Sequence, residues 1–174
     1  MSHRISPRNL EYLVVECARK IFSFILKLRQ LRYINGLMKI WKLKKGHDAS
    51  LRSKHPWVFS NELLDSPKSI KPGEPIEIQD IQGHFLARGY GNPHSLISFR
   101  ALSFYTKDEN PTTPAFIVDR IYQAWIYRKK CGFNKSFRIC YSEADQIPGL
   151  ILDRYFILLN NKKYQVFSYQ LLTA

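Results

Sequence analysis

Turn-forming residues recur so often between residues 38 and 106 that a long helix has no room there, and this spacing constrains the fold more than any other feature. Glycine and proline separate five extended segments, which are residues 38–45, 55–63, 76–80, 85–91 and 96–103. Asp48 is placed to cap a single helical turn over residues 48–54. Five short strands within about sixty-five residues are typical of a small barrel-like β domain.

A different pattern begins after the polar linker of residues 107–114. Apolar residues at helical spacing predict a helix that begins at residue 115, has Lys129 and Lys130 in its last turn and stops at Gly132. Its buried face would comprise Phe116, Ile117, Ile121, Ala124, Trp125 and Tyr127. Strands over residues 136–142 and 149–155 and a hairpin around Asn160 and Asn161 complete a partial α/β domain, so the predicted fold class is α+β.

Residues 10–34 combine apolar residues at three- and four-residue steps with basic residues between them, which predicts a basic amphipathic helix. Its charges interrupt the run too often for a transmembrane span, which needs about 20 mostly apolar residues. Such a helix can lie on an anionic membrane surface or on a partner protein. Residues 1–37 are therefore interpreted as a helical extension ahead of the folded domain, and membrane or partner binding through it is the alternative function.

Positive charge is concentrated in the first third of the chain. The formal net charge of the 174 residues is +13, and residues 1–60 contribute +10 of it. Such a field attracts polyanions, and RNA is the leading candidate. The expected contacts are Lys44, Lys45, Arg52, Lys54, His55 and Arg88, with Tyr90 and His94 as stacking partners. The competing interpretation places Trp57 and Phe59 in the core and the lysines on an ordinary solvated face.

Acidic residues gather in one short stretch, YSEADQIPGLILDRY, at residues 141–155. Glu143 and Asp145 would point the same way in an extended segment, so a catalytic pair or a metal site is conceivable. A structural role is favoured, because Asp145 can accept backbone N–H bonds in the turn and Asp153 can pair with basic residues of the preceding helix.

The chain contains no nucleophile signature, no phosphate-cradling glycine loop and no metal-binding histidine spacing. No catalytic, cofactor-binding or metal-binding residue is therefore predicted. Cys131 and Cys140 are expected to pack as small apolar residues. An odd count of three cysteines without a secretion signal favours reduced thiols in the cytoplasm.

Three strings occur in the order GHDASLRSKHPWVFSNEL, GHFLARGYGNPHSLISFRALS and SEADQIPGLILDRY. Together they closely resemble the N-terminal portion of the ribosomal RNA large subunit methyltransferase I family. The resemblance implies a PUA domain over residues 38–106 and a small central α/β domain over residues 107–174. It also implies enzymes that use S-adenosylmethionine to methylate carbon 5 of a cytosine in large-subunit RNA.

The resemblance runs from about Met38 to Tyr155 and has no counterpart for residues 1–37. It implies that the cofactor site and the catalytic cysteine belong to a Rossmann-like domain expected to be missing here, so no cofactor is predicted for this chain. Residues 156–174 diverge, as after a frameshift or an early stop. The expected product is a cytoplasmic fragment that binds structured ribosomal RNA, is inactive by itself, and could form a homodimer.

Overall fold

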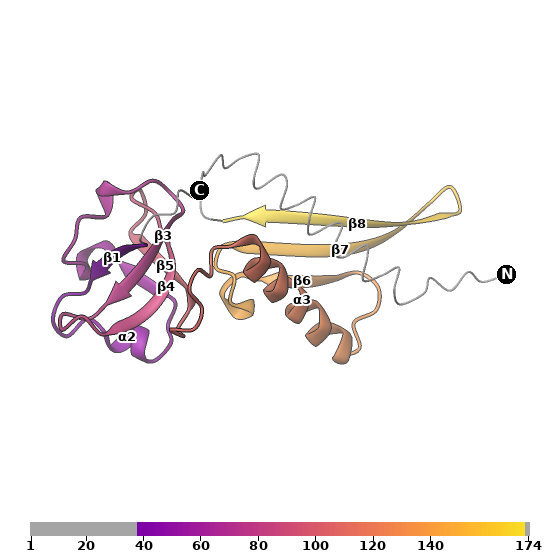
Figure 1. Cartoon of the computed structure of the whole chain (residues 1–174). Helices are drawn as coiled ribbons and strands as arrows, with labels where there is room; N and C mark the ends of the chain where they lie inside the picture. Colours follow the sequence, from indigo (N-terminus) through magenta and orange to yellow (C-terminus); the bar gives the residue numbers. More distant parts are fainter. Residues whose placement is uncertain (1–37, 173–174) are drawn as a thin grey trace.

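The computed structural model describes residues 38–172, so the helix predicted over residues 10–34 lies outside the described residues. Two sheets follow one another along the chain (Figure 1). The first sheet contains β1 (Lys39–Lys42), β2 (Trp57–Phe59), β3 (Glu74–Gln79), β4 (Phe85–Gly91) and β5 (Ile97–Ser103), and the second contains β6 (Phe137–Tyr141), β7 (Leu150–Leu159) and β8 (Lys162–Leu171). The helices are α2 (Ala49–Arg52) and α3 (Pro114–Lys130), with 3-10 turns η1 (Ser60–Glu62), η2 (Pro67–Ser69) and η3 (Ser142–Asp145). The predicted α+β class is confirmed.

The first sheet has the strand order β1-β3-β4-β5-β2. β1 runs parallel to β3, and every other neighbouring pair in this sheet is antiparallel. The sheet is not a closed barrel, but an isolated antiparallel bridge between Leu43 and Leu63 joins its two ends. The curled sheet encloses a core of large apolar side chains, which includes Trp41, Leu43, Leu51, Val58, Leu63, Ile76, Ile78 and Phe99.

Two details of this domain differ from the sequence prediction. The strand expected over residues 55–63 is only three residues long, because the Glu62 carboxylate accepts the backbone N–H of Phe59 at 2.7 Å and the chain turns into η1. The predicted helical turn is present and Asp48 occupies its N-cap position, but the expected capping bond is absent. The Asp48 side chain accepts a hydrogen bond from Arg52 instead.

The second unit packs α3 against one face of the β6–β8 sheet (Figure 1). The helix begins one residue earlier than predicted, where Thr113 Oγ1 accepts the N–H of Phe116 at 3.4 Å. Its end is as predicted, with Lys129 and Lys130 in the last turn and Gly132 just beyond it at a positive φ. The buried core contains Ile121, Trp125, Ile139, Cys140, Ile147, Leu150 and Leu152. Tyr127 was predicted on the buried face, but its side chain is 64% exposed, which corrects that assignment.

The predicted hairpin is confirmed and is longer than expected. Asn160 and Asn161 adopt φ values of 49° and 58°, as a two-residue turn between twisted strands requires. From this turn the pairing of β7 with β8 is continuous to Leu150 and Leu171. The far part of the hairpin extends past α3 (Figure 1). Its apolar side chains are exposed there, including Leu158 at 65% and Leu159 at 58%.

Arg154 on β7 is an unusual member of the second core, because it is only 2% exposed and no carboxylate pairs with it among the described residues. Its guanidinium lies 4.6 Å from the ring centre of Trp125 and 4.4 Å from that of Phe156. Burial lowers its pKa. Cation–π contacts therefore replace much of the water that the guanidinium loses on folding.

Candidate nucleic-acid interface

Lys54, Tyr105 and Lys107 form a group of two cations and one aromatic ring on the first sheet's domain. Lys54 follows α2, and its Nζ lies 3.3 Å from the hydroxyl oxygen of Tyr105 and 5.2 Å from the centre of that ring. Lys107 Nζ lies 5.6 Å from the same centre. Tyr105 is 49% exposed, so two ammonium groups from separate loops lie near one accessible ring.

Arg88 holds the turn that carries Tyr105 and Lys107. Its Nε donates to Glu77, the residue directly opposite on β3, at 2.8 Å. Its Nη1 donates to the backbone carbonyl oxygens of Thr106 and Asp108 at 2.9 and 3.1 Å. The guanidinium of Arg88, which was predicted as an RNA contact, thus makes hydrogen bonds within the protein and positions the neighbouring turn.

Arg52 is exposed, but two carboxylates already pair with it. Its Nη2 lies 2.7 Å from Asp80, and its Nε pairs with Asp48. Burial of Asp80 works to raise its pKa, yet hydrogen bonds from the backbone and ring of His84 outweigh burial and lower the pKa to about 2. Arg52 therefore presents less free positive charge to a polyanion than Lys54 does.

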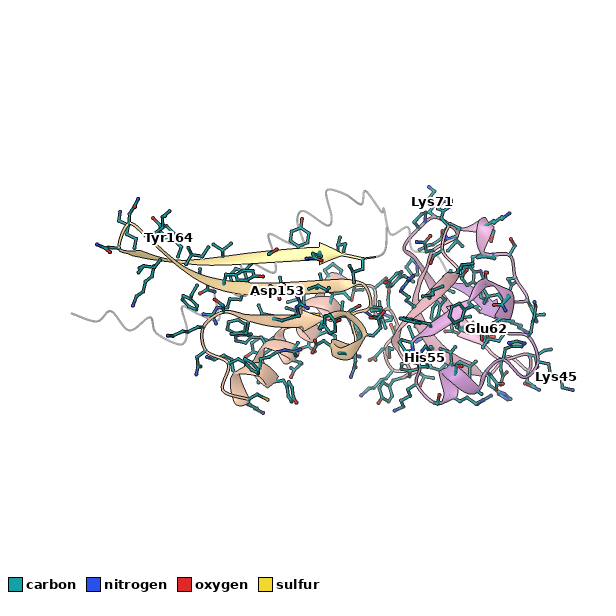
Figure 2. All side chains as sticks on the ribbon, turned by 180° about the vertical axis from the view of Figure 1, so that it is seen from behind. Lys45, His55, Glu62, Lys71, Asp153 and Tyr164 are labelled. Carbon is teal, nitrogen blue, oxygen red and sulfur yellow. The ribbon has the colours of Figure 1, made fainter. Side chains whose placement is uncertain are left out.

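The other predicted contacts are exposed but dispersed. Lys44 donates to the backbone oxygen of Asn61 at 2.7 Å, and Lys45 lies in the adjacent turn. His55 packs edge-on against Trp57 with ring centres 5.4 Å apart. Lys45 and His55 occupy separate parts of the domain (Figure 2), and the exposed His94 lies on the β4–β5 loop. The cations thus cover a broad surface rather than one pocket.

Tyr90 faces the second unit rather than solvent. Its hydroxyl donates to the backbone oxygen of Pro148 at 2.9 Å. Arg100 is the register partner of both Tyr90 and Trp57, so these three residues form a row across β4, β5 and β2. At the end of this row Trp57 Nε1 donates to a carboxylate oxygen of Glu143 at 3.0 Å. The row is the junction between the two sheets, which gives Tyr90 a structural role.

The carboxylates of the acidic stretch already accept hydrogen bonds from other groups of the protein. Asp145 accepts the Tyr141 N–H at 2.6 Å and both terminal nitrogens of Arg128, which comes from α3. Asp153 pairs with Arg138 of β6, so its predicted pairing with the helix is wrong. Glu143 and Asp145 lie in the 3-10 turn η3 and not in an extended segment. The predicted structural role of these carboxylates is confirmed by their contacts.

The two described cysteines have different surroundings. Cys140 is fully buried as predicted, and burial raises the pKa of its thiol to about 12, so it stays protonated at neutral pH. Cys131 is exposed, contrary to its predicted packing. Within residues 38–172, no three His, Cys, Asp or Glu side chains are grouped as metal ligands. No helix in the same described range is long and apolar enough to cross a membrane.

Sequence reasoning missed Tyr105, Lys107 and the contact of Trp57 with Glu143. A tyrosine followed two residues later by a lysine, just after the last predicted strand, was an available signal for the first two. The contact between Trp57 and Glu143 spans 86 residues of chain, and no local pattern indicates it.

Comparison with known proteins places these features in a class. A family model described as a PUA-like domain matches residues 42–104. A Streptococcus mutans protein assigned as a SAM-dependent methyltransferase shares the fold with a TM-score of 0.55 and 11% identity, over 78% of this chain and 50% of that one. A second protein assigned as a methyltransferase, complexed with S-adenosylhomocysteine, gives a TM-score of 0.58 and 13% identity, over 79% of this chain and 33% of that one. Residues 42–104 are thus similar to a PUA-like domain, and a small α/β unit follows them.

The sequence relatives share one name. Ribosomal RNA large subunit methyltransferase I of Vibrio cholerae is 36% identical over 117 residues, which are 65% of this chain and 28% of the relative. The Salmonella arizonae protein of the same name is 41% identical over 117 residues, with the same coverage. The chain thus spans less than a third of the length of the curated relatives it matches. Over this part the chain is similar to ribosomal RNA large subunit methyltransferase I, which confirms the resemblance predicted from the sequence.

Proposed function

We propose that the chain binds structured ribosomal RNA through its PUA-like domain. The observation that carries the proposal is the group of Lys54, Tyr105 and Lys107, in which two cations and an exposed ring meet on one surface. The exposed Lys44, Lys45, Arg52, His55 and His94 would extend the contact over the same domain. Several acids of the domain are engaged internally, since Glu77, Asp48 and Asp80 pair with arginines, so the lysines dominate the outward field.

A titration against a structured ribosomal RNA fragment at several salt concentrations tests this proposal. Affinity should fall steeply as salt rises, because phosphate contacts release counterions. Changing Lys44, Lys45 and Lys54 together to alanine should weaken binding. The slope of log affinity against log salt should fall by about 0.7–0.9 for each phosphate that the variant no longer neutralises.

Lys71→Ala is the matched control, because Lys71 is an exposed lysine of the same domain that lies away from Lys45 and His55 (Figure 2). It should leave affinity nearly unchanged. Absence of binding at low salt would contradict the proposal, and so would an equal reduction of affinity in the triple variant and the control.

We further propose that the chain acts by binding and does not bind S-adenosylmethionine by itself. The residues of the acidic turn do not fit this cofactor, because Glu143, Asp145 and Asp153 already accept bonds from Trp57, Arg128 and Arg138. Isothermal titration with S-adenosylmethionine should therefore give no binding heat. A stoichiometric signal would overturn this part of the proposal.

Three further expectations belong with it. We propose domain limits at residues 38–106 and 107–174, and a cytoplasmic location, where ribosomal RNA would be met. A homodimer is a third expectation, supported by the exposed apolar side chains of the β7–β8 hairpin, whose tip carries Tyr164 (Figure 2). Sedimentation at two protein concentrations tests the dimer, and a monomer at both would contradict it.

A further inference from the structure

We propose that Tyr105 is a stacking platform for one unpaired base of the RNA, with Lys54 and Lys107 contacting the adjacent phosphates. The inference rests on the proposed RNA-binding function and adds the chemical form of the RNA, a loop or single strand. Aromatic rings bind unpaired bases by stacking, whereas bases inside a duplex are already stacked on each other.

The ring is accessible and is not needed for packing. Tyr105 belongs to neither apolar core, and its side chain is 49% exposed. The preceding residue, Phe104, packs against the first core instead. A half-exposed tyrosine beside a buried phenylalanine leaves its ring face available to a ligand.

The turn that carries the ring is held before any ligand arrives. The Tyr105 N–H donates to Ser103 Oγ at 3.1 Å, and the Asp108 N–H donates to the Tyr105 carbonyl oxygen at 3.2 Å. Arg88 binds the carbonyl oxygens of Thr106 and Asp108, and Glu77 holds Arg88 from the neighbouring strand. A ring on such a turn loses little conformational freedom on binding, which favours affinity.

Lys54 is directed at this ring by a strained backbone. Its φ of 64° lies in the left-handed region that glycine adopts without cost, and it occupies the end of α2, where helices commonly place glycine. Strain of this kind persists where the surrounding structure enforces it, and it is often found at binding sites. It brings the Lys54 ammonium within 3.3 Å of the Tyr105 hydroxyl.

The two ammonium groups fit a nucleotide better than an isolated anion. Without a ligand they lie within 6 Å of the ring centre, at 5.2 and 5.6 Å, where the π face attracts them. A base that stacks on the ring takes that place, and the flexible lysine stems can then carry both charges to the phosphates on either side of the base. Both the ring and the charges are used only if the base is unpaired.

The test compares two RNAs of equal length and charge, a hairpin with an unpaired loop and a fully paired duplex, with the full chain and its variants. Tyr105→Leu should weaken loop binding about fivefold to a hundredfold, the effect expected of removing one stacked ring, and leave duplex binding unchanged. Tyr105→Phe should retain loop binding, because stacking needs the ring and not the hydroxyl. Tyr127→Leu is the matched control, an exposed tyrosine on α3 without paired lysines, and it should have no effect.

Lys54→Ala and Lys107→Ala should each weaken the binding of both RNAs. Each should also lower the slope of log affinity against log salt by about 0.7–0.9, as expected when one phosphate is no longer neutralised. A 2-aminopurine base in the loop should report stacking with wild type and with Tyr105→Phe, but not with Tyr105→Leu. Equal effects of Tyr105→Leu on loop and duplex, or no effect on either, would overturn the stacking role while RNA binding itself stands. Failure of the wild-type chain to bind either RNA at low salt would overturn the proposed function instead.

Discussion

Replacing Trp57 by phenylalanine removes the indole N–H that Glu143 accepts at 3.0 Å, while an aromatic ring stays at the junction of the two sheets. A hydrogen bond to a charged acceptor contributes about 1.5–3 kcal/mol to stability. Both side chains are only partly buried, so solvent weakens the bond. We therefore expect it to contribute about 1–2 kcal/mol to the free energy of unfolding.

A double-mutant cycle separates this bond from the loss of ring volume. Trp57→Phe, Glu143→Ala and the double variant are unfolded in urea at pH 7 and followed by far-UV circular dichroism. The coupling free energy between the two changes should be about 1–2 kcal/mol. Trp41→Phe with Glu143→Ala is the matched control, because Trp41 lies in the first core and its Nε1 has no hydrogen-bond partner among the described residues. Those two changes should be additive.

The coupling should also depend on pH. Burial raises the pKa of Glu143, but hydrogen bonds from Ser142, the backbone and Trp57 outweigh it and leave the pKa below its ordinary value. A carboxyl with a lowered pKa stabilises the fold above its unfolded pKa and loses that contribution as the pH falls. The coupling should therefore shrink below about pH 4. A coupling at pH 7 under about 0.3 kcal/mol, within the scatter of independent sites, would refute the idea that this bond joins the units.

Three further predictions test the first domain. Gly89→Ala should lower the free energy of unfolding in urea by more than about 3 kcal/mol, because the alanine Cβ would lie 2.0 Å from the Arg100 carbonyl oxygen on the paired strand β5. A loss below about 1 kcal/mol would contradict this steric argument. Asp80→Asn should destabilise the chain at pH 7, and the difference in stability from wild type should vanish as the pH falls through about 2. Hydrogen bonds from His84 hold the Asp80 pKa at about 2, so its charge stabilises the fold only above that range. A stability difference that is the same at pH 7 and pH 2 would contradict this prediction. Lys54→Gly should raise the free energy of unfolding by about 0.5–1 kcal/mol, because glycine adopts the left-handed backbone at that position without strain. The same change should weaken RNA binding. A fall in stability would show that the backbone there is not strained.

Local patterns were enough to predict most of the secondary structure. The helix over Pro114–Lys130 follows from apolar residues at helical spacing, and the β7–β8 hairpin follows from two adjacent asparagines. Both depend on residues within a few positions of one another. Local reasoning failed where one side chain diverted the backbone, as when Glu62 took the N–H of Phe59 and shortened β2.

Residue roles at the interface were harder to predict than the elements that carry them. Arg88 lies on a predicted strand, but its partner Glu77 is determined by the register of β3 against β4. Tyr90 lies two residues further on the same strand, and only the docking of the second unit shows that its hydroxyl meets Pro148. Neither the strand register nor the docking of the second unit can be predicted from the residues that are close in sequence.

The order of amino acids by itself determined the short strands, the long helix, the basic charge and the relationship to a ribosomal RNA methyltransferase, because each is contained in composition or in neighbouring residues. The tertiary structure alone decided which charges remain available. Lys54 meets Tyr105 across 51 residues and Trp57 meets Glu143 across 86. Such contacts form only after loops close and strands pair, so the free and the committed cations are distinguished by folding and not by residue type.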